Sequence, residues 1–522
     1  MRPNARGEAA ETAADGGRPF PPGDYPVVVV GSGPGGIQVS YSLARLGIPH
    51  ATISADEAPG GMFRRWPFFQ RLLSWTKPFA PEPRGSAPYE RYDWNSLLAV
   101  EPEHRALQPS FMDGTSYFPS RPEMERNLAA FAERTGTTVR YGTRWLTTRR
   151  EDGPDGVRFV LGTSDGDYRS PVVVFAVGVA EPWSPSTPGM ELARHYAETR
   201  AAESYADRRV FIVGKQNSGF ELASGLLQWA RRIVIASPSP TKLSVDTNSL
   251  VGVRARYVQP YEDHVLGGGV SILDASIDAI ERGETGGELV VRMRQTASGS
   301  PLAVPADDVI SATGFVAPLL DLPDLGVATF GHSRVPAQTA WWESATVPGI
   351  YFAGTISQGA QGLRKHGIPS NSGAVHGARY NARILAREIG RRHFGQAGHG
   401  RSIAAGDVIG LLIDEIAHGP ELWHQRGYLV RVVSFDADAG VRDEGTIPLA
   451  AFLDEPGSDA VGMTLESDGT GAIYPVAYVR HAGRTTEHDF DPDPLLDFGA
   501  PRYRSEIESI VRDVAPELAP AS

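Results

Sequence analysis

Two segments of the chain share one pattern: a short β-branched run, a glycine-rich turn, and then apolar residues at helical spacing. The first covers residues 26–53 and the second residues 209–236. A continuous apolar run such as 27–30 is typical of a strand that is buried on both faces of a parallel sheet. The apolar spacing over residues 37–46 predicts a helix. Because each segment ends in a further short apolar run, we predict two βαβ units.

Strand-like runs alternate with helical patterns in the rest of the central chain. Helices are predicted over residues 121–135 and 373–389, and short apolar runs lead into Gly178, Gly314 and Gly354. Such alternation favours parallel sheets that are covered by helices. The sequence therefore predicts an α/β fold class.

The two ends of the chain differ from this central part. Residues 1–24 are rich in Ala, Gly, Glu and Pro and lack an apolar signal core, so we expect a disordered leader. Residues 391–401 have the composition of a linker. Residues 401–522 contain hairpin-like strands and a final helical pattern, which predict a small C-terminal α+β domain. No apolar run approaches the roughly 18 residues that cross a bilayer, so we expect a cytoplasmic protein.

The composition of the chain excludes several kinds of binding site and catalytic group. The 522 residues have a formal net charge of -12, which gives no electrostatic footprint for nucleic acid. The chain contains 0 cysteines, which excludes disulfides, thiolate metal sites, iron–sulfur clusters and cysteine nucleophiles within it. The 13 histidines do not fall into convincing ligand spacings, so no metal is expected.

The first glycine-rich turn has the sequence of a phosphate-binding loop. Gly31 permits the tight turn, Gly33 lets the backbone approach a pyrophosphate, and Gly36 lets helix and strand pack closely. Pro34 stands at the start of the helix that points at the anion. Together with the strand and helix around it, this loop predicts a dinucleotide site.

The acid expected to bind the adenosine ribose is displaced. About 20 residues after the loop, where an acid is usual, the chain has Ser54, and Asp56 follows two residues later. Asp56 either takes the role through a shifted backbone or is a solvated loop acid.

The second glycine-rich turn differs from the first. Gln216 replaces the middle glycine, which predicts a looser grip and a cofactor that dissociates. The next strand ends at Ser237 and not in an acid. Ser237, Lys242 and the pair 231–232 could accept a 2′-phosphate, which favours NADPH over NADH; alternatively the two arginines only solvate the helix end. The expected cofactor-binding residues of this turn are Gly214, Gln216, Asn217, Ser218, Gly219 and Glu221.

The ordered set of glycine-containing segments resembles the flavoproteins with two dinucleotide-binding domains. These include flavin-containing, N-hydroxylating and Baeyer–Villiger monooxygenases and thioredoxin-reductase-like enzymes. The segments are Gly31–Gly36, Gly60-Gly61, Ala176–Gly178, Gly214–Gly219, Ala312–Phe315 and Phe352–Gly354. The resemblance implies FAD on the first loop and NADPH on the second. It implies an FAD-binding domain at residues 25–182 and 306–392, with an NADPH-binding domain at residues 183–305 inserted in it.

The same resemblance implies further cofactor contacts and a branch of the family. The implied contacts are Gly60, Gly61, Met62, Gly178, Thr313, Gly314, Gly354 and Thr355. Thr355 replaces the family's aspartate, which touches the flavin ribityl chain. Phe352–Thr355 and His376–Asn381 are most similar to a class B monooxygenase-related branch, which includes the eukaryotic FAD-dependent oxidoreductase domain proteins.

The resemblance implies monooxygenase chemistry once the absence of cysteine is considered. Disulfide reductases of this fold use a redox cysteine pair, so that activity would require a substrate that is itself the disulfide. In the monooxygenases O2 forms a C4a-(hydro)peroxyflavin, which here is expected to oxidise the nitrogen of an amine or amino acid. The alternatives are an NADPH-dependent reductase with a small acceptor, and a flavin-bound interaction protein with vestigial turnover.

A Baeyer–Villiger signature is not matched. Gly189 and His195 are separated by five residues where the signature has three, and Thr199 occupies its aromatic position. Heteroatom oxidation is therefore favoured over lactone formation, and His195 is expected to be a structural histidine.

The candidate catalytic and substrate-binding residues lie outside the glycine loops, except Asn217. Lys77 and Lys365 are expected to approach the flavin from its two sides, where a lysine would stabilise the anionic reduced form; the alternative is that both face solvent. Residues 242–287 exceed what a compact nucleotide domain requires. This insertion could bind a substrate carboxylate through Arg254, Arg256 and Tyr257, or it is a surface excursion. A small-molecule substrate and O2 are the expected partners, without nucleic acid or membrane, and a homodimer is compatible with the sequence.

Overall fold

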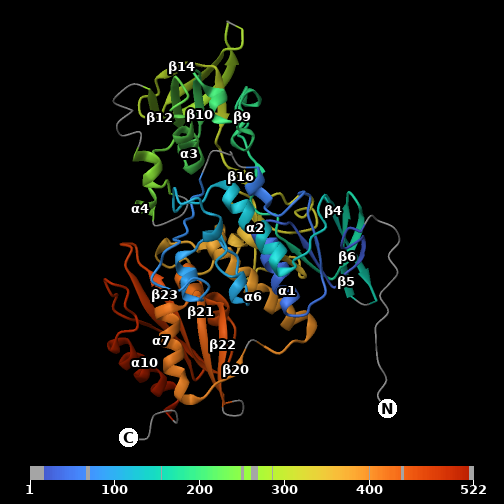
Figure 1. Cartoon of the computed structure of the whole chain (residues 1–522), viewed down its shortest axis with the longest axis vertical. Helices are drawn as coiled ribbons and strands as arrows, with labels where there is room; N and C mark the ends of the chain where they lie inside the picture. The colour runs from blue at the N-terminus through green and yellow to red at the C-terminus, as the bar shows by residue number, and fades with distance from the viewer. Residues whose placement is uncertain are drawn as a thin grey trace.

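The structure, a computed structural model, describes residues 17–65, 71–154, 156–247, 252–259, 269–284, 286–398, 400–436 and 440–516. It confirms the predicted α/β fold with two Rossmann-like units and a C-terminal α+β part. In Figure 1 the inserted domain lies at the top, the first domain in the centre and the C-terminal domain below. Most of the predicted leader, and part of the insertion after Lys242, lie outside the described residues.

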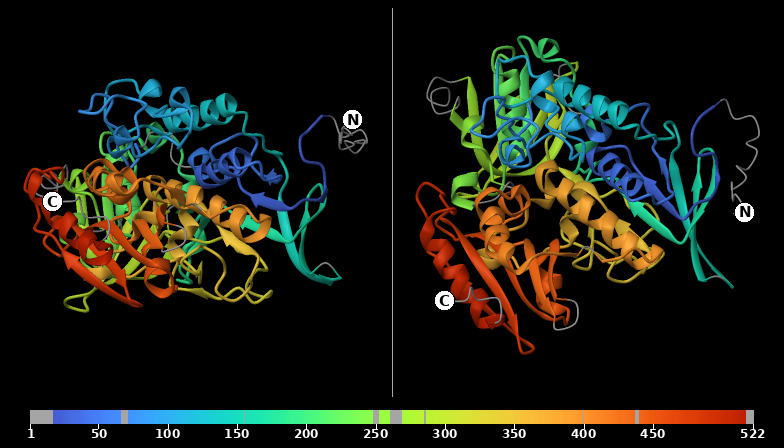
Figure 2. Two further views of the ribbon diagram at one scale, coloured as in Figure 1. Left: turned by 90° about the horizontal axis from the view of Figure 1, so that it is seen from below. Right: turned by 60° about the horizontal axis from the view of Figure 1, so that its bottom comes forward.

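The first domain is built on a four-stranded parallel sheet in the order β19-β7-β2-β3. Its strands are β2 (Val27–Val30), β3 (Ala51–Ile53), β7 (Val172–Phe175) and β19 (Ile350–Phe352), and its helices are α1 (Pro34–Arg45), α2 (Arg121–Thr135) and α6 (Val375–Phe394). Every strand is buried along its length, as the continuous apolar runs predict. Helices α1 and α6 lie side by side (Figure 2). Helix α6 continues to Phe394, so the segment predicted as a linker begins inside this helix.

The inserted domain contains a seven-stranded sheet in the order β14-β13-β12-β11-β10-β15-β9. Its elements are β9 (Arg194–His195), β10 (Arg209–Val213), α3 (Asn217–Leu226), β11 (Arg232–Ser237), α4 (Ser244–Thr247), β12 (Val270–Arg282), β13 (Leu289–Gln295), β14 (Pro301–Ala306) and β15 (Asp308–Ser311). β15 lies after residue 305, so this sheet extends beyond the predicted domain boundary. The strands β8 (Glu181–Pro182) and β16 (Phe315–Val316) pair where the chain crosses between the two domains.

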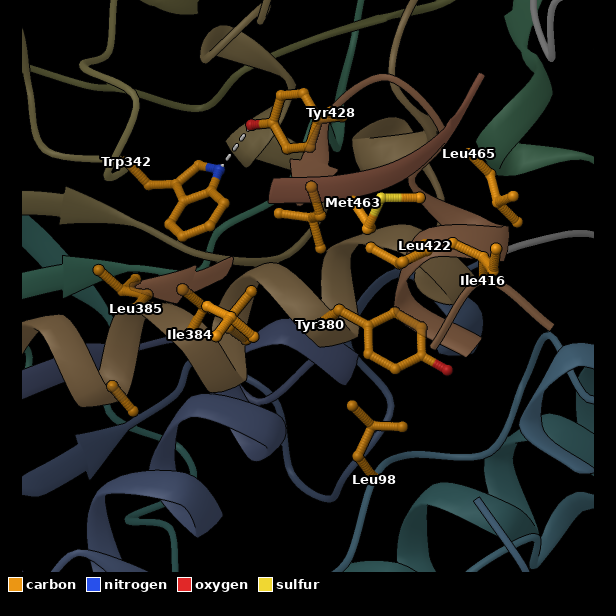
Figure 3. Close-up of a cluster of buried hydrophobic side chains, with 14 of the residues drawn as sticks. Leu98, Trp342, Tyr380, Ile384, Leu385, Ile416, Leu422, Tyr428, Met463 and Leu465 are labelled. Atoms are coloured by element: carbon orange, nitrogen blue, oxygen red, sulfur yellow. Dashed lines mark hydrogen bonds between the residues drawn. The ribbon is translucent and has the colours of Figure 1, made fainter. Parts of the chain in front are cut away.

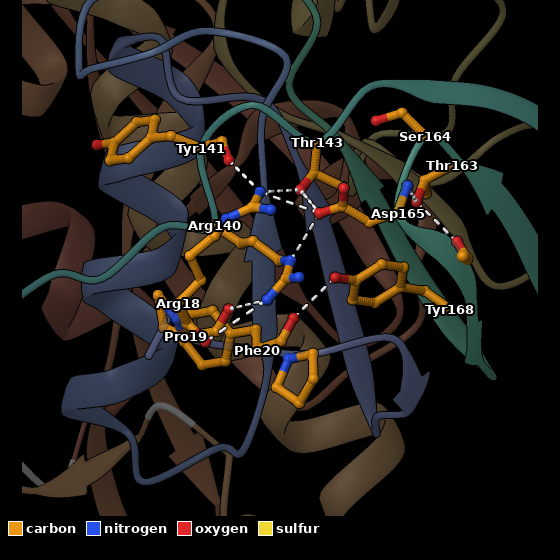
Figure 4. Close-up of polar contacts among 12 residues, drawn as sticks. Arg18, Pro19, Phe20, Arg140, Tyr141, Thr143, Thr163, Ser164, Asp165 and Tyr168 are labelled. Carbon is orange, nitrogen blue, oxygen red and sulfur yellow. Dashed lines mark hydrogen bonds and ion pairs between the residues drawn. The ribbon is translucent and has the colours of Figure 1, made fainter. Parts of the chain in front are cut away.

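A second small sheet anchors the beginning of the described chain. It has the order β1-β6-β5-β4 and contains β1 (Gly23–Asp24), β4 (Trp145–Gly153), β5 (Gly156–Thr163) and β6 (Gly166–Ser170). Figure 4 shows the contacts: Arg140 Nε donates to Asp165 at 2.8 Å, and Tyr168 donates to the Phe20 carbonyl at 2.7 Å. Arg18 forms an ion pair with Asp165 at 2.9 Å. The prediction of a disordered leader up to residue 24 is therefore wrong for residues 18–24, which are bound to the first domain.

The C-terminal domain is a six-stranded antiparallel sheet with helices on it. The sheet order is β20-β22-β21-β23-β24-β25. Its elements are β20 (Arg401–Ser402), α7 (Val408–His418), α8 (Pro420–His424), β21 (Leu429–Asp436), β22 (Gly440–Pro448), α9 (Leu449–Asp454), β23 (Asp459–Ser467), β24 (Ile473–His481), β25 (Arg484–Asp489) and α10 (Pro501–Val514).

The C-terminal domain shares one hydrophobic core with the first domain. Leu98, Tyr380 and Leu385 of the first domain belong to the same buried cluster as Leu422 and Met463 (Figure 3). The Trp342 indole N–H donates to the Tyr428 hydroxyl across this interface at 2.9 Å. A short pair, β17 (Thr329–Phe330) and β18 (Val335–Pro336), completes the strands of the first domain. Separating the two domains would expose this common core to water, so we expect them to fold together.

Candidate functional site

The two glycine loops are built in the same way. Gly31 and Gly214 have φ values of +117° and +115°, in the region that L side chains rarely adopt. A Cβ on Gly31 would lie 3.0 Å from the carbonyl carbon of Ala176, and a Cβ on Gly214 would lie 3.0 Å from that of Ala312. The backbone just after the neighbouring strand, β7 for Gly31 and β15 for Gly214, therefore leaves no room for a side chain at the turn.

The helix that follows each loop begins without a side-chain cap. Gly33, the N-cap of α1, has no side chain, and the side chain of Gln216, the N-cap of α3, does not bond the first turn. Gly36 and Gly219 let each helix pack on its own loop, because a Cβ at either position would overlap the carbonyl oxygen of the loop's first glycine. A helix N-terminus of this kind binds a phosphate through its amides and its dipole. Both loops therefore fit the pyrophosphate of a dinucleotide.

The turn at Gly60-Gly61 folds back over the first loop. The Gly60 N–H donates to the Ser32 carbonyl at 3.1 Å, and a Cβ on Gly61 would lie 2.9 Å from the Gly33 Cα. Met62 follows this turn and lines the same cavity as the loop. The turn therefore packs against the first loop, and its contact with FAD stays a prediction.

Asp56 lies beside Ser54, just after the end of β3. The hydroxyls of Ser32 and Ser54 lie 2.8 Å apart, and each lies 3.3 Å from Asp56 Oδ2. Arg65 forms an ion pair with the other carboxylate oxygen at 3.3 Å. Asp56 lines the cavity, so its carboxylate can accept a hydrogen bond from a ribose hydroxyl there.

The corresponding position of the second unit holds an ion pair. Ser237 pairs in register with Asp274 of β12, and the buried Lys215 forms an ion pair with this aspartate. Arg231 and Arg232 stand at the opposite end of β11, about 16 Å away for five strand residues, and Arg231 pairs with Asp207. The idea that these two arginines accept a 2′-phosphate is therefore wrong.

Both loops open into one cavity of about 1300 Å³. Single ligand pockets measure roughly 300–1,000 Å³, so this cavity has room for more than one ligand. The residues expected at the site that line it are Gly31, Gly33, Pro34, Ser54, Asp56, Gly61, Met62, Gly178, Gln216, Asn217, Ser218, Glu221, Lys242, Arg254, Gly354 and Thr355. The expected residues that support it without lining it are Gly36, Gly60, Gly214, Gly219, Ser237, Arg256, Tyr257, Thr313 and Gly314.

Asn217 connects the second loop to the insertion. Its Nδ2 donates to the Gly252 carbonyl at 3.1 Å, and its Oδ1 accepts from the Arg254 N–H at 3.1 Å. Both polar atoms of the amide thus hold the insertion, which places the Arg254 side chain in the cavity wall. Asn217 is therefore a positioning residue in this structure, and a catalytic role for it stays a prediction.

Glu221 is a buried acid on the nucleotide side of the cavity. The hydroxyls of Tyr196 and Tyr257 each lie 3.3 Å from one of its carboxylate oxygens. Burial raises the pKa of Glu221 to about 7, against the lowering effects of Arg256 and the two tyrosines. Arg256 itself donates to the Tyr257 hydroxyl at 2.6 Å. Arg256 and Tyr257 thus contact one another and Glu221 and do not line the cavity, so substrate binding by these two residues stays a prediction.

The two lysines expected beside the flavin do not line the cavity. Lys77 is exposed, and its backbone bonds Tyr89 and Tyr92. Lys365 lies 2.7 Å from Glu466 Oε2 and also pairs with Glu487 in the C-terminal sheet. The prediction that the two lysines approach the flavin is wrong for this geometry. Lys77 faces solvent, and Lys365 is paired with carboxylates of the C-terminal domain.

His195 and Thr313 hold together the segments that cross between the two domains. His195 Nδ1 accepts from the Ala197 N–H at 3.1 Å, and its Nε2 lies 3.1 Å from the Gly314 carbonyl. Thr313 donates to the Trp183 carbonyl at 2.6 Å. Both ring nitrogens of His195 are thus engaged at the junction of the two domains, in line with the expected structural role.

Three cavity residues escaped the sequence analysis. His376 stands in the first turn of α6 and stacks on Trp94, with ring centroids 4.0 Å apart. Arg426 enters from the C-terminal domain. The segment around His376 carried the family resemblance without indicating a role, and no local pattern marks Trp94 or Arg426. Their importance depends on contacts between distant segments.

Comparison with known proteins identifies the family. Residues 28–354, which are more than half of the chain, match the family described as pyridine nucleotide-disulphide oxidoreductase. The chain belongs to this family. The description of this family names oxidoreductases that act with a pyridine nucleotide, and FAD and a pyridine nucleotide are the cofactors that fit the two loops.

Relatives of the chain include two vertebrate proteins. FAD-dependent oxidoreductase domain-containing protein 2 of Mus musculus is 28% identical over 395 residues, covering 70% of this chain and 58% of the relative. The protein of the same name from Danio rerio is 25% identical over 411 residues, with the same coverage. The chain thus spans less than two thirds of the length of these relatives.

Solved structures share the fold of this family member over about 70% of the chain. The flavin-containing monooxygenase of Stenotrophomonas maltophilia has a TM-score of 0.51 at 21% identity, covering 70% of this chain and 98% of its own. The ornithine N-hydroxylase of Kutzneria sp. 744 has a TM-score of 0.53 at 16% identity, with coverages of 71% and 100%. The bacillithiol disulfide reductase of Staphylococcus aureus has a TM-score of 0.55 at 14% identity, with coverages of 71% and 99%.

Within the described part of the chain, every helix is too short or too polar to cross a membrane.

Proposed function

We propose that the chain is an FAD- and NADPH-dependent monooxygenase of the class B type, which oxidises the nitrogen of an amine or amino acid. The observation that carries this proposal is that both phosphate-binding loops open into one cavity, so two nucleotides can meet inside one chain. The likeness to an N-hydroxylase and a flavin-containing monooxygenase supports it at the level of the fold.

FAD fits the first loop and the adjoining wall. The α1 amides would bind its pyrophosphate, Asp56 its ribose, and Thr355 would stand where the ribityl chain passes. When bound, FAD supplies the redox and oxygen chemistry of the reaction. Leu72, Leu73 and Val375 line the inner cavity with Trp94 and would exclude water from it.

NADPH fits the second loop. The α3 amides would bind its pyrophosphate, with the Gln216 side chain keeping the grip loose. Lys242 lines the cavity, and Lys215 neutralises Asp274 beside Ser237. An unpaired acid at this place would repel a 2′-phosphate, so the ion pair favours NADPH.

The proposed reaction consumes one oxygen molecule per substrate. A primary amine, O2, NADPH and a proton give the hydroxylamine, water and NADP⁺. One oxygen atom forms the new N–O bond, the other is reduced to water, and NADPH provides the two electrons. The chain's own residues bind the two nucleotides, position the amine and exclude water.

A reductase is the second candidate. The fold is shared with bacillithiol disulfide reductase, and in that case the electrons would pass to a small acceptor. Because the chain has 0 cysteines, such an acceptor would have to carry its own disulfide or another reducible group.

Rapid mixing tests both candidates on the flavin-loaded protein. The flavin is reduced anaerobically with NADPH and then mixed with O2 while NADP⁺ stays bound. A lasting species whose spectrum matches neither oxidised nor reduced flavin supports oxygenation, and immediate return to the oxidised spectrum favours the reductase. If NADPH leaves the flavin oxidised, both proposals fail and a flavin-bound interaction protein remains.

A further inference from the structure

The cavity wall brings together two arginines and a histidine from three parts of the chain. Arg254 comes from the insertion, His376 from the start of α6, and Arg426 from the loop after α8 in the C-terminal domain. The charges of Arg254 and Arg426, together with that of Arg379, act on His376 and lower its pKa further than burial alone does. The histidine is therefore neutral, and the two guanidinium groups lie close to it.

Neither Arg254 nor Arg426 has an acidic partner in the described part of the chain. The Arg426 side chain donates to the Trp423 carbonyl at 3.0 Å and lies near Arg91, a like charge. Burial lowers the pKa of Arg426 to about 10. Burial also lowers the pKa of Arg254, whose charged neighbour is Arg256. By contrast, Arg379 donates to the Glu90 carbonyl at 3.2 Å and lies close enough to the Glu90 carboxyl to act on its pKa.

Buried polar atoms around these arginines lack hydrogen-bond partners among the described residues. They are Arg254 Nε, both ring nitrogens of His376 and Trp94 Nε1. His376 is only 1% exposed. Leaving a buried charge or donor unpaired costs several kcal/mol, so a ligand that supplies the missing acceptor would stabilise this arrangement. The acceptor that suits two guanidinium groups and a neutral imidazole is a carboxylate.

We propose that Arg254 and Arg426, together with His376, bind the carboxylate of the substrate. This proposal rests on the proposed monooxygenase function and makes its substrate an amino acid, or another small acid, in place of a simple amine. It also gives the C-terminal domain a part in the site, because Arg426 completes the subsite from that domain.

The C-terminal domain holds Arg426 rigidly against the first domain. The preceding residue, Gln425, donates to Asn381 at 2.8 Å and to Ser372 at 3.1 Å, and it accepts from the Asn371 N–H at 2.9 Å. A preorganised charge loses little freedom when a ligand binds. The subsite is therefore built into the junction of the two domains and does not need to be assembled by the substrate.

Equilibrium binding of a simple carboxylate to the oxidised holoenzyme tests the subsite without turnover. Benzoate is titrated in the absence of NADPH while flavin absorbance is followed, and benzamide serves as the uncharged match. We expect saturable binding of benzoate, at least tenfold weaker binding of benzamide, and at least tenfold weaker benzoate binding in Arg254→Gln and in Arg426→Gln. Arg426→Lys keeps the charge and is expected to lie between wild type and Arg426→Gln.

Arg364→Gln is the matched control, because Arg364 is an exposed arginine that also lines the cavity. Benzoate affinity is expected to stay within twofold of wild type in this variant. An equal loss in Arg364→Gln would indicate a general electrostatic field and overturn the subsite, as would failure of benzoate to bind wild type. If benzoate affinity is unchanged in both Arg254→Gln and Arg426→Gln while the flavin midpoint potential changes, the two charges act on the flavin. That result would also overturn the subsite. Since none of these readouts needs oxygenation, the subsite and the proposed function can fail separately.

Discussion

Gly35 and Gly354 approach each other so closely that Gly35 cannot carry a side chain. A Cβ on Gly35 would lie 2.5 Å from the Gly354 backbone nitrogen and nearer still to its Cα. Gly354 has a φ of +78°, which also favours glycine. The contact joins the first turn of α1 to the end of β19, so it fixes the first phosphate loop relative to Thr355.

Replacing Gly35 with alanine is expected to remove FAD. The added methyl group would push α1 away from residue 354 and displace the amides that bind the pyrophosphate. We expect flavin absorbance per protein to fall more than tenfold and the melting temperature to drop. Gly410→Ala is the control, since Gly410 lies exposed in α7 with no atom within 4 Å of an added Cβ. That variant should keep its flavin and gain up to about 1 kcal/mol in stability. Full flavin content in Gly35→Ala would show that the close approach is not required.

Lys365 is expected to contribute to stability and not to catalysis. Although burial alone would lower it, the pKa of Lys365 is raised by Glu466 and Glu487, and Glu466 is buried. Lys365→Met would leave this acid without its cation and destabilise the protein by about 3 kcal/mol. Urea unfolding should report that loss, while the rate of flavin reduction per bound FAD stays unchanged. A slower reduction at equal flavin content would restore the catalytic interpretation.

The fold was predictable because its signals are local. The continuous runs at β2 and β10, and the glycines at 31 and 214, report burial and turn geometry within a few residues of chain. The domain boundary near residue 305 was harder to predict, since β15 belongs to the inserted sheet through its pairing with β10 and β9 and not through any local pattern.

Much of the site could not be predicted because it depends on tertiary contacts. Lys365 follows a glycine turn that resembles a cofactor motif, yet carboxylates more than 100 residues away engage it. Arg426 gave no local signal, since nothing in the sequence tells that the C-terminal domain shares a core with α6. Arg254 was predicted to lie at the site and does line the cavity, but the role of Asn217 in placing it was not predictable.

Because of Asp165, we expect the stability of the first domain to fall at acid pH. Burial would raise its pKa, but hydrogen bonds from Thr143, Arg140 and Arg18 outweigh burial and lower it. The stabilisation is therefore present above the ordinary aspartate pKa, near 3.8, and is lost as pH falls through the folded-state value. Asp165→Asn should lower the free energy of unfolding at pH 7 by on the order of 3 kcal/mol, because Arg140 is buried. The difference from wild type should shrink below pH 3.8; a difference independent of pH would argue against the charge pair.

Glu221 is expected to destabilise the protein as pH rises. Its pKa is raised to about 7, so the folded state stays protonated while an unfolded glutamate ionises from its ordinary value near 4.5 upwards. The stability is then highest at acid pH, declines between about 4.5 and 7, and is constant above. Glu221→Gln keeps an acceptor for the hydroxyls of Tyr196 and Tyr257 and removes this decline. The variant should match wild type near pH 4.5 and exceed it above pH 7 by on the order of 3 kcal/mol; parallel stability curves for the two proteins would contradict the assigned pKa.

Lys215 is expected to set the preference between NADPH and NADH. It occupies the position in the second loop that Ser32 occupies in the first, and its side chain pairs with Asp274 beside Ser237. Lys215→Ala would leave the Asp274 carboxylate unpaired where a 2′-phosphate would lie. The KM for NADPH should then rise at least tenfold, whereas the KM for NADH should change less, because a free 2′-hydroxyl can donate to the carboxylate. The double variant Lys215→Ala with Asp274→Asn removes the repelling charge and should recover part of the NADPH affinity. Equal loss of both coenzymes in the single variant, without recovery in the double variant, would mean that Lys215 only supports the fold of the loop.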